Sequence, residues 1–69
     1  MAKIQHGDRV LARSATNEWL RRRALTGVVQ GMDFPVVWLC RDEDWNGGKT
    51  PESNPNAVPW PAEEVRVDQ

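Results

Sequence analysis

The fold is decided by the stretch Pro35-Val36-Val37-Trp38-Leu39-Cys40. Its β-branched and aromatic residues favour extended backbone, and its proline stands at the first position, where a strand needs no ladder donor. Val36, Trp38 and Cys40 share one face, and Val37 and Leu39 share the other, so both faces are apolar. We therefore expect a central β-strand over 35–40, with the Trp38 indole buried in the core.

Upstream of this stretch the pattern predicts two more strands. Gly31 and Asp33 mark a turn, and the segment before it is expected to be extended from about 22 to 30. Residues 8–13 form a short half-buried strand, because Val10 and Ala12 fall on one face between flanking arginines.

The segment 17–25 allows two interpretations. Thr16 or Asn17 can cap a short helix there, but a helix of that length is not stable alone. We favour a loop that leads into the strand.

Downstream, residues 41–57 are rich in glycine, proline and asparagine and predict a long polar loop. Pro61 suits the first position of a single helical turn that continues through Ala62-Glu63-Glu64, and Val65 and Val67 begin a final short strand. The prediction is an all-β fold: a five-stranded, partly open barrel with one long polar loop and one helical turn before the last strand. It forms a single domain over 1–69, with 1–6 expected to fray.

Composition excludes several classes of protein. One cysteine, Cys40, permits no internal disulfide, and with His6 as the only histidine a tetrahedral zinc site is excluded. A net charge of −1 argues against broad attraction to nucleic acid or anionic membranes. No apolar run approaches the length of a membrane span and no signal peptide is recognised, so we expect a cytoplasmic protein without a membrane partner.

Several short motifs resemble the bacterial Src-homology-3-like group of small β-barrels. The opening Gly7-Asp8-Arg9-Val10, the pair Thr26-Gly27-Val28-Val29 and Pro35-Val36-Val37-Trp38, and the ending Val58-Pro59-Trp60-Pro61-Ala62-Glu63-Glu64-Val65 carry the resemblance. It implies a barrel fold and a tendency to bind other molecules, although a fold does not determine a function. The tyrosine-rich groove of the eukaryotic peptide-binding members has no counterpart here, because the chain has no tyrosine.

Tryptophan is more abundant than so small a core requires, which favours a noncatalytic protein-interaction module. We expect the module to bind a protein partner, or its own copy, through aromatic and acidic side chains. These candidates are Trp19, Trp45, Trp60, Phe34, Asp42 and Asp44. For Trp60 we favour the alternative that its ring plugs one end of the barrel.

The acidic segment also resembles the start of a calcium loop, with Asp42, Asp44, Asn46 and Gly47 at the expected spacing. Ser53 stands at the twelfth position, where calcium needs a bidentate glutamate. We therefore expect a solvated turn and no metal.

Two alternative functions remain open. The basic cluster Arg21, Arg22 and Arg23, extended by Arg13, predicts nucleic-acid binding as the main rival. A structural homodimer is the third possibility. Catalysis has little support, because neither His6 nor Cys40 has a recognisable partner for nucleophilic chemistry, and no cofactor is expected.

Overall fold

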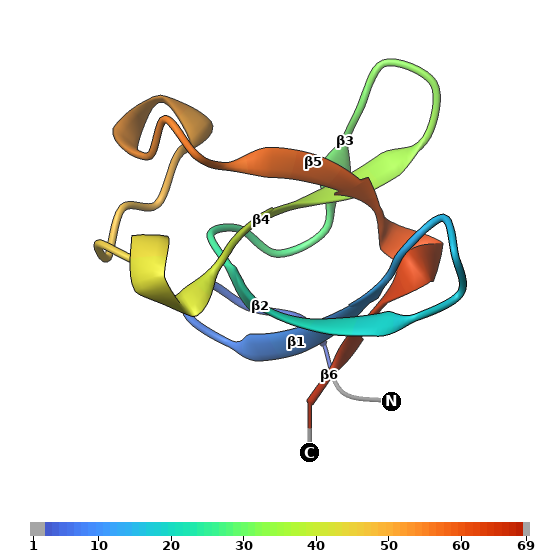
Figure 1. The fold of residues 1–69 in the computed structure, drawn as a ribbon. Helices are drawn as coiled ribbons and strands as arrows, with labels where there is room; N and C mark the ends of the chain where they lie inside the picture. Colours follow the sequence, from blue (N-terminus) through green and yellow to red (C-terminus); the bar gives the residue numbers. More distant parts are fainter. Residues whose placement is uncertain (1–2, 69) are drawn as a thin grey trace.

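The computed structural model describes residues 3–68 as an antiparallel sheet curled into an open half-barrel (Figure 1). Six strands alternate with turns and three short 3-10 helices: β1 (Arg9–Arg13), β2 (Trp19–Ala24), β3 (Val29–Gln30), β4 (Pro35–Cys40), η1 (Asp42–Asp44), η2 (Pro51–Ser53), β5 (Val58–Pro61), η3 (Ala62–Glu64) and β6 (Val65–Val67). The predicted all-β, partly open barrel is confirmed.

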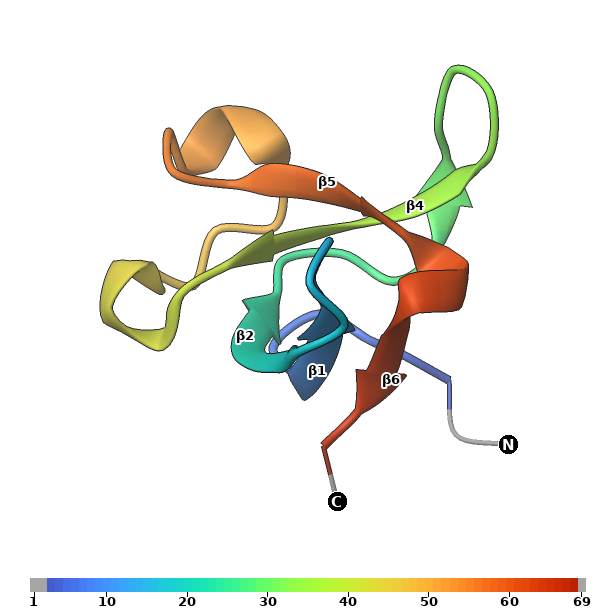
Figure 2. The same cartoon turned by 45° about the vertical axis from the view of Figure 1, so that its right-hand side comes forward.

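β4 is the central strand, as its two apolar faces predict. The strand order is β3-β4-β2-β1-β6, and β5 pairs with the other edge of β4. Figures 1 and 2 show β4 and β5 crossing over the layer formed by β1, β2 and β6. Because β2 turns from one layer into the other, the sheet encloses its core on the concave side.

The core is built from small aliphatic side chains, and Trp38 is not among them. Val37 and Leu39 are fully buried and pack with the inward residues of the other strands, which are Val10, Ala12, Ala24 and Val65. Trp38 is half-buried on the opposite face of β4, directly across from Pro59 of β5. The expectation of a buried Trp38 indole was wrong, because the face of β4 that meets β1 and β2 carries Val37 and Leu39.

The strand expected over 22–30 is instead interrupted. β2 begins earlier, at Trp19, so the segment 17–25 is a turn and a strand rather than a helix. Ala24 pairs with Leu39, but Val29 pairs with Val36, so the intervening chain carries two extra residues against β4. The Thr26 hydroxyl accepts the Trp38 backbone N–H at 3.3 Å in place of a ladder carbonyl.

β5 was not predicted, because Pro59 and Pro61 lack backbone donors. Among the described residues it pairs with β4 alone, so it lies at an edge of the sheet, where prolines are tolerated. The single turn after it is confirmed as η3, with Pro61 one position earlier than expected, at the N-cap.

The long polar segment is confirmed as irregular, but η1 and η2 and several side-chain hydrogen bonds hold it in place. Asn54 is 2% exposed; its Nδ2 donates to the Asp44 carbonyl at 2.9 Å and its Oδ1 accepts the Asn56 N–H at 3.0 Å.

At the N-terminus, the expected fraying needs correction for residues 4–6, while residues 1–2 lie outside the described part. Ile4 packs against the core, and the His6 ring lies 2.8 Å from the Leu25 carbonyl. Across residues 3–68, no helix has the length and apolar character needed to cross a bilayer.

Candidate binding surfaces

The outward face of β2, β1 and β6 gathers most of the arginines. Strand alternation buries Val10 and Ala12 and turns the intervening β1 residues outward, and the register places β2 and β6 side chains beside them. This face carries Arg9, Arg13, Arg21, Arg23 and Arg66 together with Trp19, and we call it the arginine face. It holds five of the seven arginines in the chain.

The arginines of this face differ in how firmly they are paired. Arg13 is held by both carboxylate oxygens of Glu64, and this contact raises the pKa of Arg13 and lowers the pKa of Glu64. Arg21 lies 3.9 Å from Asp68, with an 83% exposed side chain. Arg9 has no ion pair within residues 3–68. Exposed pairs as loose as that of Arg21 contribute about 0–1 kcal/mol, so this cation is available to an anionic ligand.

Trp19 supplies an aromatic surface among these cations. Its residue is 39% exposed, and the Arg66 guanidinium lies 4.1 Å from the ring centroid in a cation–π contact. An exposed indole beside guanidinium groups can stack a planar group while the arginines bind its charge.

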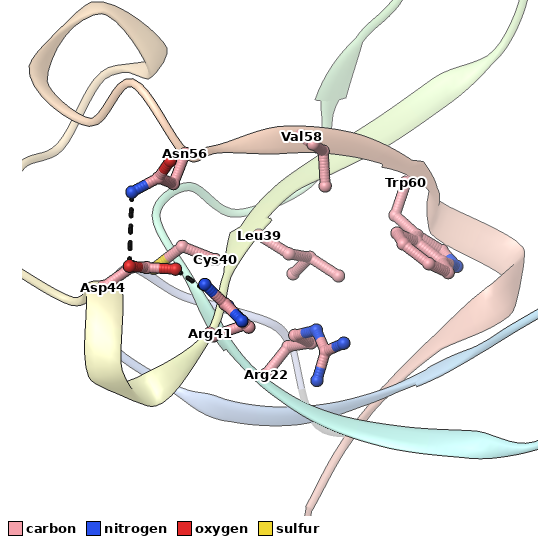
Figure 3. A pocket seen from close by; sticks show the side chains of 8 residues that line it. All are labelled: Arg22, Leu39, Cys40, Arg41, Asp44, Asn56, Val58 and Trp60. Atoms are coloured by element: carbon pink, nitrogen blue, oxygen red, sulfur yellow. Dashed lines mark hydrogen bonds and ion pairs between the residues drawn. The ribbon is translucent and has the colours of Figure 1, made fainter.

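Arg22 separates from its two neighbours in the sequence. It stands opposite Val10 on the inward side of β2, so the predicted cluster of three arginines divides between two faces. Its side chain enters an open cleft between β2 and β5, which we call the β2–β5 cleft (Figure 3). The cleft measures about 260 Å³ and is lined by Arg22, Leu39, Cys40, Arg41, Asp44, Asn56, Val58 and Trp60.

At one end of this cleft the charges are already neutralised. Arg41 Nε donates to Asp44 at 3.0 Å, which raises the pKa of Arg41, and Asn56 Nδ2 donates to the same carboxylate at 3.2 Å. The carboxylate of Asp44 is therefore already hydrogen-bonded to side chains of the same chain.

Trp45 and Asp42 are likewise engaged with neighbouring segments. The Trp45 ring lies 4.7 Å from the Arg23 guanidinium and 5.1 Å from the His6 ring, while Asp42 lies 3.8 Å from Arg23. These contacts fasten the polar loop to β2 and to the N-terminal turn, so Trp45 is half-buried rather than displayed.

Trp60 contacts the barrel core, in keeping with its favoured interpretation as a plug, but its ring also borders the open β2–β5 cleft. The ring packs against the core from β5, and its Nε1 donates to the Arg13 carbonyl at 3.0 Å. This hydrogen bond joins β5 to the end of β1, two strands that are not paired with each other.

Phe34 lies on a different surface, at the hairpin between β3 and β4. Phe34 is 50% exposed and Met32 is fully exposed, and hollows of about 620 and 470 Å³ flank Phe34. Trp38 and Pro59 line the larger hollow. The hairpin surface is our name for the residues around these two hollows, which are Val28, Met32, Phe34, Trp38 and Pro59.

The predicted site residues thus form no single site. Trp19 joins Arg13 and Arg21 on the arginine face, Phe34 lies on the hairpin surface, and Trp45 and Trp60 turn toward the molecule itself. Arg66 was missed because it is isolated in the sequence; the one signal was its place between Val65 and Val67 on an alternating strand.

Within residues 3–68, no group of three histidine, cysteine or carboxylate side chains is arranged to hold a metal ion. Cys40 is 2% exposed, and burial is the main cause that raises the pKa of its thiol.

Comparison with known proteins yields no relative from which a function can be transferred: no family model, no curated protein and no solved structure matches this chain. The candidate surfaces therefore rest on their geometry alone.

Proposed function

We propose that this chain is a noncatalytic domain that binds single-stranded nucleic acid on the arginine face. The observation that carries the proposal is the gathering of arginines from three adjacent strands around the exposed ring of Trp19. Proteins that bind single strands combine a basic surface along the backbone with aromatic rings on which bases stack.

The spacing of the arginines suits a phosphate chain. Side chains two residues apart on one strand are separated by about 6.8 Å, and those on neighbouring strands by about 4.8 Å. Guanidinium groups bind phosphate oxygens in a bidentate manner, so Arg21 and Arg66 can hold successive phosphates while a base stacks on Trp19.

Net charge does not oppose this proposal, because the charges are separated in space. The chain carries ten acidic and nine basic residues, yet within residues 3–68 the carboxylates paired with the arginine face are three, those of Asp42, Glu64 and Asp68. Most carboxylates lie elsewhere, which orients the molecule toward a polyanion and keeps the binding sensitive to salt.

The test is a fluorescence-anisotropy titration of a labelled twelve-nucleotide strand at two salt concentrations. Arg21→Gln combined with Arg66→Gln is expected to weaken binding at least fivefold and to reduce the salt slope by about 1.4, since each phosphate contact contributes about 0.7 for single strands. Trp19→Ala is expected to cost about 1–3 kcal/mol of binding free energy, the value of one stacked base.

Lys49→Gln is the matched control, because it removes one exposed cation from the polar loop and leaves the arginine face intact. Absence of binding by the natural chain at low salt would overturn the proposal. So would an equal loss of affinity in Lys49→Gln, which would indicate diffuse attraction to charge.

The second candidate function is self-association through the hairpin surface. It is favoured by the exposure of Met32 and Phe34 beside β3, a terminal strand that pairs with β4 alone among the strands of residues 3–68. An unpaired strand edge next to apolar side chains can add a strand from a second copy.

Sedimentation velocity over a hundredfold concentration range tests this candidate. A rising sedimentation coefficient that Phe34→Ser abolishes would support it, with Val58→Ser as a control of similar exposure outside the hairpin. A constant monomer at every concentration would exclude it.

A further inference from the structure

The β2–β5 cleft lies where the half-barrel is open, because β2 and β5 face each other without pairing. Figure 3 shows Arg22 extending from β2 toward Leu39 of β4 and Trp60 of β5. The proposed nucleic-acid function does not use this cleft, since the arginine face lies on the other side of β2.

Arg22 has no anionic partner in residues 3–68. Its Nη1 donates at 2.7 Å to the carbonyl of the adjacent Arg21, and none of the ion pairs includes it. The other cation at the cleft, Arg41, is bound to Asp44 and lies 3.7 Å from Glu43. Arg22 is thus the one cation lining the cleft that forms no ion pair within residues 3–68, and it keeps guanidinium donors for a ligand.

The walls beside Arg22 are apolar. Leu39 forms the floor and is fully buried, and Val58 and the Trp60 ring form the side on β5. The volume of about 260 Å³ is slightly below the usual range of about 300–1,000 Å³ for ligand pockets. It suits a group the size of one aromatic side chain rather than a nucleotide.

We infer that the β2–β5 cleft binds a compact aromatic carboxylate. The carboxylate forms a bidentate pair with the Arg22 guanidinium, and the ring lies against Trp60 and Val58. The same chemistry is offered by a free arylcarboxylic acid and by the C-terminal phenylalanine of a peptide chain.

The experiment is a titration of the ¹⁵N-labelled protein with benzoate, followed by NMR shifts of the Trp60 indole and the Val58 amide. Benzoate is expected to shift these signals with saturation, and benzamide, the neutral isostere, is expected to bind at least tenfold more weakly. Arg22→Gln is expected to weaken benzoate binding at least tenfold, because a bidentate charged pair is lost.

Arg21→Gln is the matched control, since it removes the neighbouring guanidinium from the opposite face of the same strand. It should leave benzoate binding unchanged while it weakens nucleic-acid binding, and Arg22→Gln should do the reverse. Each proposal can therefore fail without the other.

Two further probes distinguish the sources of the ligand. Acetyl-glycyl-phenylalanine with a free carboxylate tests the chain end, and its amide is the control. Tighter binding of the peptide acid than of benzoate assigns the cleft to a protein C-terminus, and the opposite order assigns it to a free acid.

The inference is overturned if neither acid shifts the Trp60 signal, if benzamide binds as well as benzoate, or if Arg22→Gln leaves the affinity unchanged. A dispersed spectrum of Arg22→Gln shows that the variant is folded. Should that variant unfold, Arg22→Lys, which keeps the charge and loses the bidentate geometry, is expected to bind benzoate severalfold more weakly.

Discussion

Asn54 is the buried polar side chain on which the order of the long loop depends. Both ends of its amide are used, toward Asp44 and Asn56, and the residue is 2% exposed. Asn54→Ala leaves two backbone groups without their partner, which costs about 1–3 kcal/mol for a buried group. We expect the midpoint of urea unfolding to fall accordingly.

Asn56→Ala is the control for this prediction, because Asn56 is exposed and contributes one side-chain hydrogen bond, to Asp44. Its effect on the unfolding midpoint should be smaller. Equal stabilities of Asn54→Ala and the natural chain would show that the loop does not depend on the amide.

At the residue scale, sequence reasoning placed Trp60 correctly and Trp38 wrongly. The interpretation of Trp60 as a plug agrees with the contact between its ring and the core, although the strand β5 that carries it was not predicted. Both faces of β4 are apolar, so nothing local tells which one meets the second layer. Trp45 depends on His6 and Arg23, which are remote in the sequence, and its environment was not predictable.

At the scale of the elements, patterning predicted β1, β4 and η3 well, because alternation and proline position act locally. The break between β2 and β3 was not predictable, since it requires Thr26 to meet Trp38 across the sheet. The division of the arginine cluster follows from alternation once β2 is known to begin at Trp19. Because the segment 17–25 allowed two interpretations, the start of β2 and hence this division of the arginines were not predicted.

The link between β1 and η3 predicts a dependence of stability on pH. Hydrogen bonding from Arg13 lowers the pKa of Glu64 in the folded state, so the folded chain holds its proton less tightly than the unfolded chain. The resulting stabilisation is fully present above the ordinary glutamate pKa of about 4.3 and is lost as the pH falls through the lowered value.

Melting temperatures from pH 6 to pH 2.5 test this prediction. The natural chain should be more stable than Glu64→Gln at pH 6, and the difference should shrink at acid pH. The melting temperature of Glu52→Gln, a variant in the exposed turn η2, should change with pH in the same way as that of the natural chain. A difference that stays constant across the range would contradict a role for the Glu64 charge.

At the scale of the whole molecule, the arrangement of charge matters more than its sum. A net charge of −1 argued against attraction to nucleic acid, but the sum does not reveal that five arginines share one face. The pairing of β1 with both β2 and β6 brings residues 9, 21 and 66 together. This long-range register is what composition and local patterning cannot supply.

The most direct measurement of the central claim is an NMR map of the chain with a single-stranded oligonucleotide. The arginine Nε–H signals of Arg9, Arg21 and Arg66 and the Trp19 indole should shift together, while Arg22 and the hairpin signals of Met32 and Phe34 stay in place. Shifts confined to the hairpin, or no shifts at low salt, would contradict the claim that the outward face of β1, β2 and β6 is the binding surface.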